Sequence, residues 1–174
     1  MGAWGYYDDE NDCCCDSWMD LIDQFYQKFG EKTEKELSCE DIEKIVFNTL
    51  NENPDSYNFI IDNFLNFSDS EKIGLSLNLI KLLNRQDLQI QPLFGFPPDS
   101  DLNKLELPKN FPEKLTDLVI ESIKIKLVDI ENEGWADNQE RKKALNHELY
   151  LFSKGKFGSN GINIKNSFND GRFN

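Results

Sequence analysis

The segment 70–84, SEKIGLSLNLIKLLN, constrains the fold more than any other stretch of the chain, because it is apolar on most sides of a helix. A helix that is hydrophobic all round is buried in a protein core. Other elements must therefore surround this segment, and we expect it at the centre of the molecule, with Ser70 as its candidate N-cap. A chain of 174 residues is long enough to provide that cover within one compact domain.

The segment 12–29, DCCCDSWMDLIDQFYQKF, predicts an amphipathic helix. At about 100° per residue, the side chains within about 80° of Trp18 are those of Leu21, Ile22, Phe25, Tyr26 and Phe29. The opposite side carries Asp16, Asp20, Asp23 and Gln27. Asn11 or Asp12 is a natural N-cap for this helix. We expect the apolar side to pack on the core and the acidic side to face water.

Two more helices are predicted in the first half of the chain. Ser38 and Asp41 have the spacing of a capping box, and Pro54 ends the helix that they begin. Its residues at helical apolar spacing are Ile42, Ile45, Val46, Thr49 and Leu50. A shorter helix is predicted over 55–66.

The second half predicts two long helices. Pro112 suits the first turn of a helix over 112–132. Its apolar-face positions are Leu115, Leu118, Val119, Ser122, Ile123, Ile125 (in part), Leu127 and Ile130. Asp137 and Glu140 have capping spacing before the last helix, NQERKKALNHELYLFSK, and Gly155 lies where a glycine that follows a helix is expected.

Two segments break the helical pattern. Pro92, Pro97, Pro98 and Pro108 forbid a continuous helix over 86–111, whose many leucines and phenylalanines indicate an ordered excursion packed on the core. The tail 156–174 is rich in Gly and Asn and is expected to be extended or disordered, with Phe157, Phe168 and Phe173 as candidate partner contacts. The sequence therefore predicts an all-α fold, with one compact domain of five or six helices over 1–155 and a short tail.

The charge of the chain limits its partners. The net charge is −13, from 32 acids and 19 bases. A surface this acidic repels phosphate backbones and anionic membranes, so we expect neither nucleic-acid nor membrane binding. No Lys or Arg precedes Lys28 and no apolar run is long enough to span a bilayer, so we expect a cytoplasmic protein.

Neither the cysteines nor the histidine predicts a chemical site. Cys13, Cys14 and Cys15 are adjacent and lack the spacing that brings two thiolates to one zinc ion. On the helical wheel Cys14 and Cys15 lie near Trp18, where they would pack as small hydrophobes, whereas Cys13 is expected to be exposed. His147 is the only imidazole and is expected at a helix surface or boundary. We therefore predict no catalytic residue, metal, cofactor or small-molecule ligand.

The opening of the chain resembles an uncharacterised family, mostly bacterial, with relatives in large DNA viruses and eukaryotes, catalogued as a domain of unknown function. Its members begin Met-Gly-Ala/Thr-Trp-Gly and continue with Asn-Asp and then Asp-Trp. The matching residues here are Met1, Gly2, Ala3, Trp4, Gly5, Asn11, Asp12 and Asp16, and Trp18 follows after an inserted Ser17. The resemblance extends through GWADNQERKKAL to about residue 153, and it implies a helical domain and no known activity.

The opening residues are interpreted as scaffold. Gly2 fits an acylation signal, but Tyr6 stands where Ser or Thr is required. We expect Trp4 to be buried, Gly5 to supply a turn, and the segment MGAWG to tuck beneath the first helix.

These observations favour a non-enzymatic, acidic protein–protein interaction module whose partner is another protein or a second copy of the chain. Two alternatives stay open. One is an enzyme with an unrecognised carboxylate site near the proline-rich excursion. The other is a virion-associated or immunity-type component that occludes a basic partner.

Overall fold

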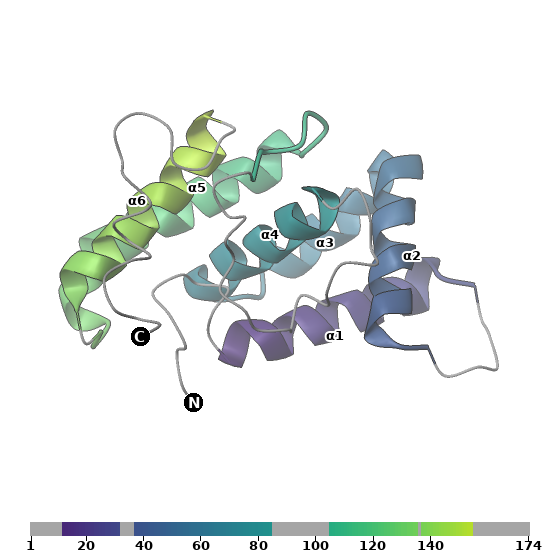
Figure 1. Cartoon of the computed structure of the whole chain (residues 1–174), viewed down its shortest axis with the longest axis horizontal. Helices are drawn as coiled ribbons and strands as arrows, with labels where there is room; N and C mark the ends of the chain where they lie inside the picture. Colours follow the sequence, from purple (N-terminus) through teal and green to yellow (C-terminus); the bar gives the residue numbers. More distant parts are fainter. Residues whose placement is uncertain (1–11, 32–36, 85–104, 136, 155–174) are drawn as a thin grey trace.

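The computed structural model describes residues 12–31, 37–84, 105–135 and 137–154, and within these ranges the chain is all-α, as the sequence predicts (Figure 1). The elements in chain order are α1 (Asp12–Phe29), α2 (Cys39–Glu52), the 3-10 turn η2 (Pro54–Ser56), α3 (Tyr57–Phe64), α4 (Asp69–Asn84), α5 (Glu113–Val128), the 3-10 turn η4 (Ile130–Asn132) and α6 (Asn138–Lys154).

Helix α4 lies at the centre of the molecule. Residues 73–80 are all buried, so this helix has no solvated side over two turns. It packs against α1 and α2 on one side and α5 on the other, and α5 in turn packs against α6. Figure 1 shows α4 between α1 and the α5–α6 pair. The prediction that this segment is central is confirmed.

Helix α1 has the predicted amphipathic arrangement. Trp18 is buried together with Leu21, Ile22 and Phe25, while Tyr26 and Phe29 are half-buried. The opposite side, with Asp16, Asp20, Asp23 and Gln27, is exposed.

Helix α2 begins and ends as predicted, but its buried side is shifted. Asp41 N–H donates to Ser38 Oγ over 3.2 Å and Ser38 N–H donates to Asp41 Oδ2 over 3.1 Å, which is the predicted capping box. The buried residues are Glu43, Val46 and Leu50, at spacings of three and four. These three residues are buried because neighbouring helices pack against this side of α2. The prediction used apolar positions alone, so it could not include Glu43.

The cap of α4 is Ser68, and the prediction of Ser70 is wrong. Glu71 N–H donates to Ser68 Oγ over 3.3 Å, and Ser68 N–H donates to Glu71 Oε2 over 2.9 Å. The cap therefore lies two residues earlier than predicted, and the helix begins at Asp69.

Helix α5 is shorter than the predicted 112–132. Pro112 is the extended N-cap rather than part of the first turn, and the helix ends at Val128. The chain turns at this end, so that Ile130 in η4 is buried while Val128 is exposed. Gly134 then takes a φ of 73°, a left-handed conformation that favours glycine.

The end of the proline-rich segment packs on the core. Leu105 and Phe111 are buried, and the Asn84 side chain holds the Glu106 backbone, donating from Nδ2 to the carbonyl over 2.8 Å and accepting from the N–H over 3.2 Å. The expectation of a packed excursion is confirmed for 105–111, whereas 86–104 lies outside the described residues. Gly155 and the tail 156–174 also lie outside them, so the boundary at 155 stays a prediction.

Candidate functional site

The turn between α5 and α6 holds a group of charged side chains around one carboxylate. Arg141 in α6 has 0% exposure, and its Nε donates to Glu133 Oε2 over 3.4 Å. Trp135 Nε1 donates to the same oxygen over 2.6 Å, and Lys126 Nζ lies 2.9 Å from Oε1. The Arg141 guanidinium also lies 4.8 Å from the centre of the Trp135 ring. We call these four residues the Glu133 cluster.

The Glu133 cluster balances a buried cation. A buried guanidinium costs free energy unless charge and hydrogen bonds compensate it, and Glu133 supplies both. The flat guanidinium also suits stacking on an indole. The three donors come from α5, from the turn and from α6, so the cluster links the end of α5 to the start of α6. Its geometry is that of a structural clamp.

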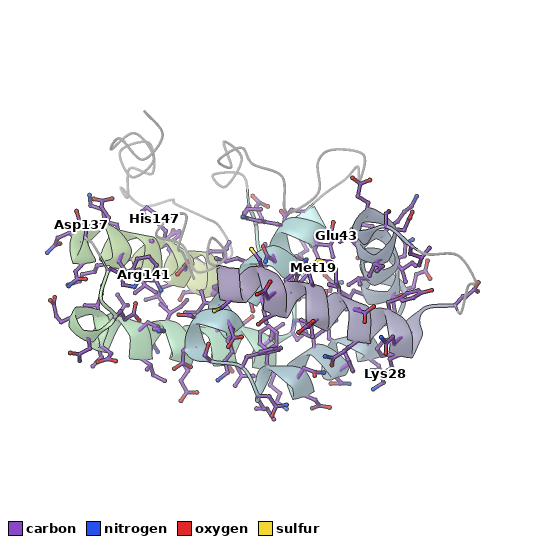
Figure 2. All side chains as sticks on the ribbon, turned by 90° about the horizontal axis from the view of Figure 1, so that it is seen from below. Met19, Lys28, Glu43, Asp137, Arg141 and His147 are labelled. Atoms are coloured by element: carbon purple, nitrogen blue, oxygen red, sulfur yellow. The ribbon has the colours of Figure 1, made fainter. Side chains whose placement is uncertain are left out.

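Two further ionisable groups of α6 are buried. His147 and Glu148 both have 0% exposure, so the prediction that His147 lies at a helix surface or boundary is wrong. His147 follows Ala144 by three residues and precedes Leu151 by four, and both of these neighbours are buried. This apolar row was the signal in the sequence that could have placed the imidazole inside. Figure 2 shows Asp137, Arg141 and His147 along α6.

The predicted motif residues fall into two groups. Gly2, Trp4, Gly5 and Asn11 lie outside the described residues, as do the tail residues Phe157, Phe168 and Phe173. Asp12 begins α1. Asp16 is exposed on α1, while Trp18 is buried and its indole Nε1 has no hydrogen-bond partner within 12–31, 37–84, 105–135 and 137–154. The two described motif residues that have side-chain placements therefore lie on different sides of one helix.

The cysteines behave mainly as the helical wheel predicts. Cys14 is fully buried, with Asn78 Nδ2 at 3.9 Å from its sulfur, and Cys15 is half-buried. Cys13 and Cys39 are exposed. Among the described residues, no group of three or more His, Cys, Asp or Glu side chains is arranged to hold a metal ion. None of the described helices is both long and apolar enough to cross a bilayer.

Sequence reasoning missed an apolar surface on the outside of the domain. Three large apolar side chains are exposed in the described part of the chain: Leu65 by 64%, Ile125 by 48% and Val128 by 88%. Ser122 Oγ donates to Asp69 Oδ1 over 2.8 Å, which holds the start of α4 against α5. Leu65 precedes Asp69 by four residues, and Ile125 and Val128 follow Ser122 by three and six. We call Ile125 and Val128 on α5, together with Leu65 at the end of α3, the α3–α5 apolar surface.

The charges around the α3–α5 apolar surface differ from those of the chain as a whole. Helix α5 carries equal numbers of acids and bases, Glu113, Asp117 and Glu121 against Lys114, Lys124 and Lys126. By contrast, α1 carries four acids and one base. The apolar side chains of α5 are therefore on a locally neutral helix within an acidic protein.

Comparison with known proteins does not extend these observations. No protein-family model matches the chain, and neither a curated protein nor a solved structure does. The resemblance of the opening residues to an uncharacterised family therefore stays a prediction.

Proposed function

We propose that this chain is a non-enzymatic, acidic protein–protein interaction module that associates with a second copy of itself through the α3–α5 apolar surface. The observation that carries the proposal is the exposure of Val128 and Ile125, one turn apart on the same side of α5. Isolated exposed apolar residues are common, but two large ones that lie one turn apart on the same helix are typical of an interaction surface.

The charge pattern supports a second copy as the partner. Two copies of a chain with a net charge of −13 repel each other wherever their acidic surfaces meet. Helix α5 is neutral overall, and its exposed Glu121 and Lys124 offer charges of both signs beside Ile125 and Val128. An interface centred there keeps the acidic stripe of α1 out of the contact.

Light scattering after size-exclusion chromatography, over a range of protein concentrations, tests this proposal. We expect the native chain to have a mass above 20.2 kDa that falls on dilution, and the double variant Ile125→Ser, Val128→Ser to be monomeric at every concentration. Asn48→Ser, at an exposed position of α2, is the matched control and should behave as the native chain. A strictly monomeric native chain, or a double variant that still associates, would overturn the proposal.

The two alternatives stay predictions. An enzyme built on acids near the proline-rich excursion would depend on residues 86–104, which lie outside the described ranges. A component that occludes a basic partner is compatible with the acidic side of α1, and genomic neighbours would separate this role from self-association.

A further inference from the structure

Two phenylalanine rings form a corner at the carboxyl end of α1. The centroids of Phe29 and Phe59 lie 5.9 Å apart, and their planes meet at 87°. Behind them the Phe25 ring is buried, 4.7 Å from Phe29 and 5.8 Å from Phe59. Phe29 and Phe59 are only half-buried, so both rings are partly exposed at the surface.

An ammonium group already occupies this corner. Lys28 Nζ lies 4.8 Å from the centroid of Phe59 and 5.5 Å from that of Phe29. The negative face of an aromatic ring attracts a cation at such distances. Lys28 is exposed and forms no ion pair with any residue in the described ranges, although the chain carries 32 acids. Among the described residues, the two rings and no carboxylate contact its ammonium.

The surrounding electrostatics also favour a cation. The corner lies at the carboxyl end of α1, where the helix dipole presents its negative end. The exposed Asp20 and Asp23 on the same helix add negative charge, and the whole chain is strongly acidic. Figure 2 shows Lys28 at the opposite end of the molecule from Arg141, so the corner is distinct from the Glu133 cluster.

We propose that the Phe29–Phe59 corner is a binding site for the ammonium group of a lysine side chain on a basic partner peptide. Lys28 fills the corner until the partner lysine replaces it. Replacement costs little, because Lys28 sits on a flexible stem and gives up no ion pair with the described residues. The site uses none of the residues of the α3–α5 apolar surface, so the proposal of a lysine site can be tested independently of self-association.

Nuclear magnetic resonance of ring-labelled phenylalanine tests the site directly. The probes are the capped tripeptides Gly-Lys-Gly and Gly-norleucine-Gly, which share a linear side chain and differ in the terminal ammonium. We expect the lysine peptide to shift the Phe29 and Phe59 ring signals and the norleucine peptide to bind at least about twofold more weakly. Equal binding of the two peptides would overturn the proposal.

Variants separate the corner from general attraction by an acidic protein. Lys28→Ala vacates the corner and should strengthen lysine-peptide binding about two- to fivefold relative to Lys44→Ala, which removes the same charge from an exposed position of α2. Phe59→Leu should abolish the Phe29 ring shift, and Phe29→Leu does the same for Phe59 if the first variant fails to fold. If Lys28→Ala binds no more tightly than Lys44→Ala, or if binding survives the loss of a ring, the proposal is wrong.

Discussion

The hydroxyl of Ser122 in α5 donates a 2.8 Å hydrogen bond to Asp69 in the first turn of α4. This bond joins the central helix to the helix that carries the exposed Ile125 and Val128. Ser122 is itself buried, so water competes little for its hydroxyl group. A part-buried polar contact therefore helps to position Ile125 and Val128 relative to α4.

Replacing Ser122 with Ala should lower the free energy of unfolding by about 1–2 kcal/mol, because a buried hydrogen bond to a carboxylate is lost. Lys72, 3.6 Å from Asp69 Oδ1, keeps that carboxylate partly compensated. Urea denaturation monitored by circular dichroism measures the change. The half-exposed Ser70→Ala is the control, and an equal loss in both variants would contradict the assignment.

The N-cap of α4 offers a second stability test. Ser68→Ala removes the oxygen that accepts from the Glu71 N–H, and it should lower the free energy of unfolding by about 0.5–2 kcal/mol. Ser70→Ala, at the position that the sequence favoured, should change it by less than about 0.5 kcal/mol. The reverse order of the two effects would show that the helix begins later than Asp69.

Features set by neighbours in the sequence could be predicted. The acidic and apolar sides of α1 follow from residue spacing alone, and the capping box of Ser38 and Asp41 needs only four residues. The central position of α4 could also be predicted from its own segment, because a helix that is apolar on most sides is stable only when it is surrounded by other elements.

Features set by packing between helices could not be predicted. Glu43 and Arg141 are buried because of what lies against α2 and α6, and no pattern in their own segments distinguishes them from solvated charges. The end of α5 was placed too late because apolar spacing continues to Ile130, which reaches the core through a turn rather than along the helix. The exposure of Ile125 and Val128 could not be predicted either, because it depends on which sides of α5 the neighbouring helices cover.

Stability should decrease at acid pH through Glu71. Its pKa is lowered from the ordinary value of 4.5: burial acts to raise it, but hydrogen bonds from Ser17 Oγ and from the Ser68 hydroxyl and N–H outweigh that effect. A carboxylate with a lowered pKa stabilises the fold above about pH 4.5, and this stabilisation is lost as the pH falls through the folded-state pKa. Glu71→Gln should therefore reduce the loss of stability below pH 4.5, measured as unfolding free energy against pH. A pH profile identical to that of the native chain would contradict this role.

The Glu133 cluster should be sensitive to removal of its buried cation. Arg141→Met should lower the free energy of unfolding by about 1–3 kcal/mol, because Glu133 and Trp135 lose a partner while Lys126 still compensates the carboxylate. The double variant Arg141→Met, Glu133→Gln should lose less than the sum of the two single losses, since both changes remove the same Arg141–Glu133 contact. Thermal and urea unfolding measure both. Strictly additive losses would show that the two residues do not act together.

Burial of Tyr57 should lower the stability of the fold at alkaline pH. Tyr57 is the first residue of α3, and its buried ring lies with its centroid 6.3 Å from that of Phe111. Its hydroxyl has no hydrogen-bond partner in the described part of the chain. Burial raises the pKa of Tyr57 from 10.0 to about 12. Because the folded state resists deprotonation, stability is fully present below pH 10 and is lost as the pH rises toward 12.

Tyr57→Phe keeps the ring and removes the hydroxyl, so it should match or exceed the native stability at pH 7 and lose less between pH 10 and pH 12. Tyr150→Phe, at a half-buried position of α6, is the control in the same urea titrations. A large loss of stability in Tyr57→Phe at pH 7 would show that the hydroxyl makes a contact essential to the fold.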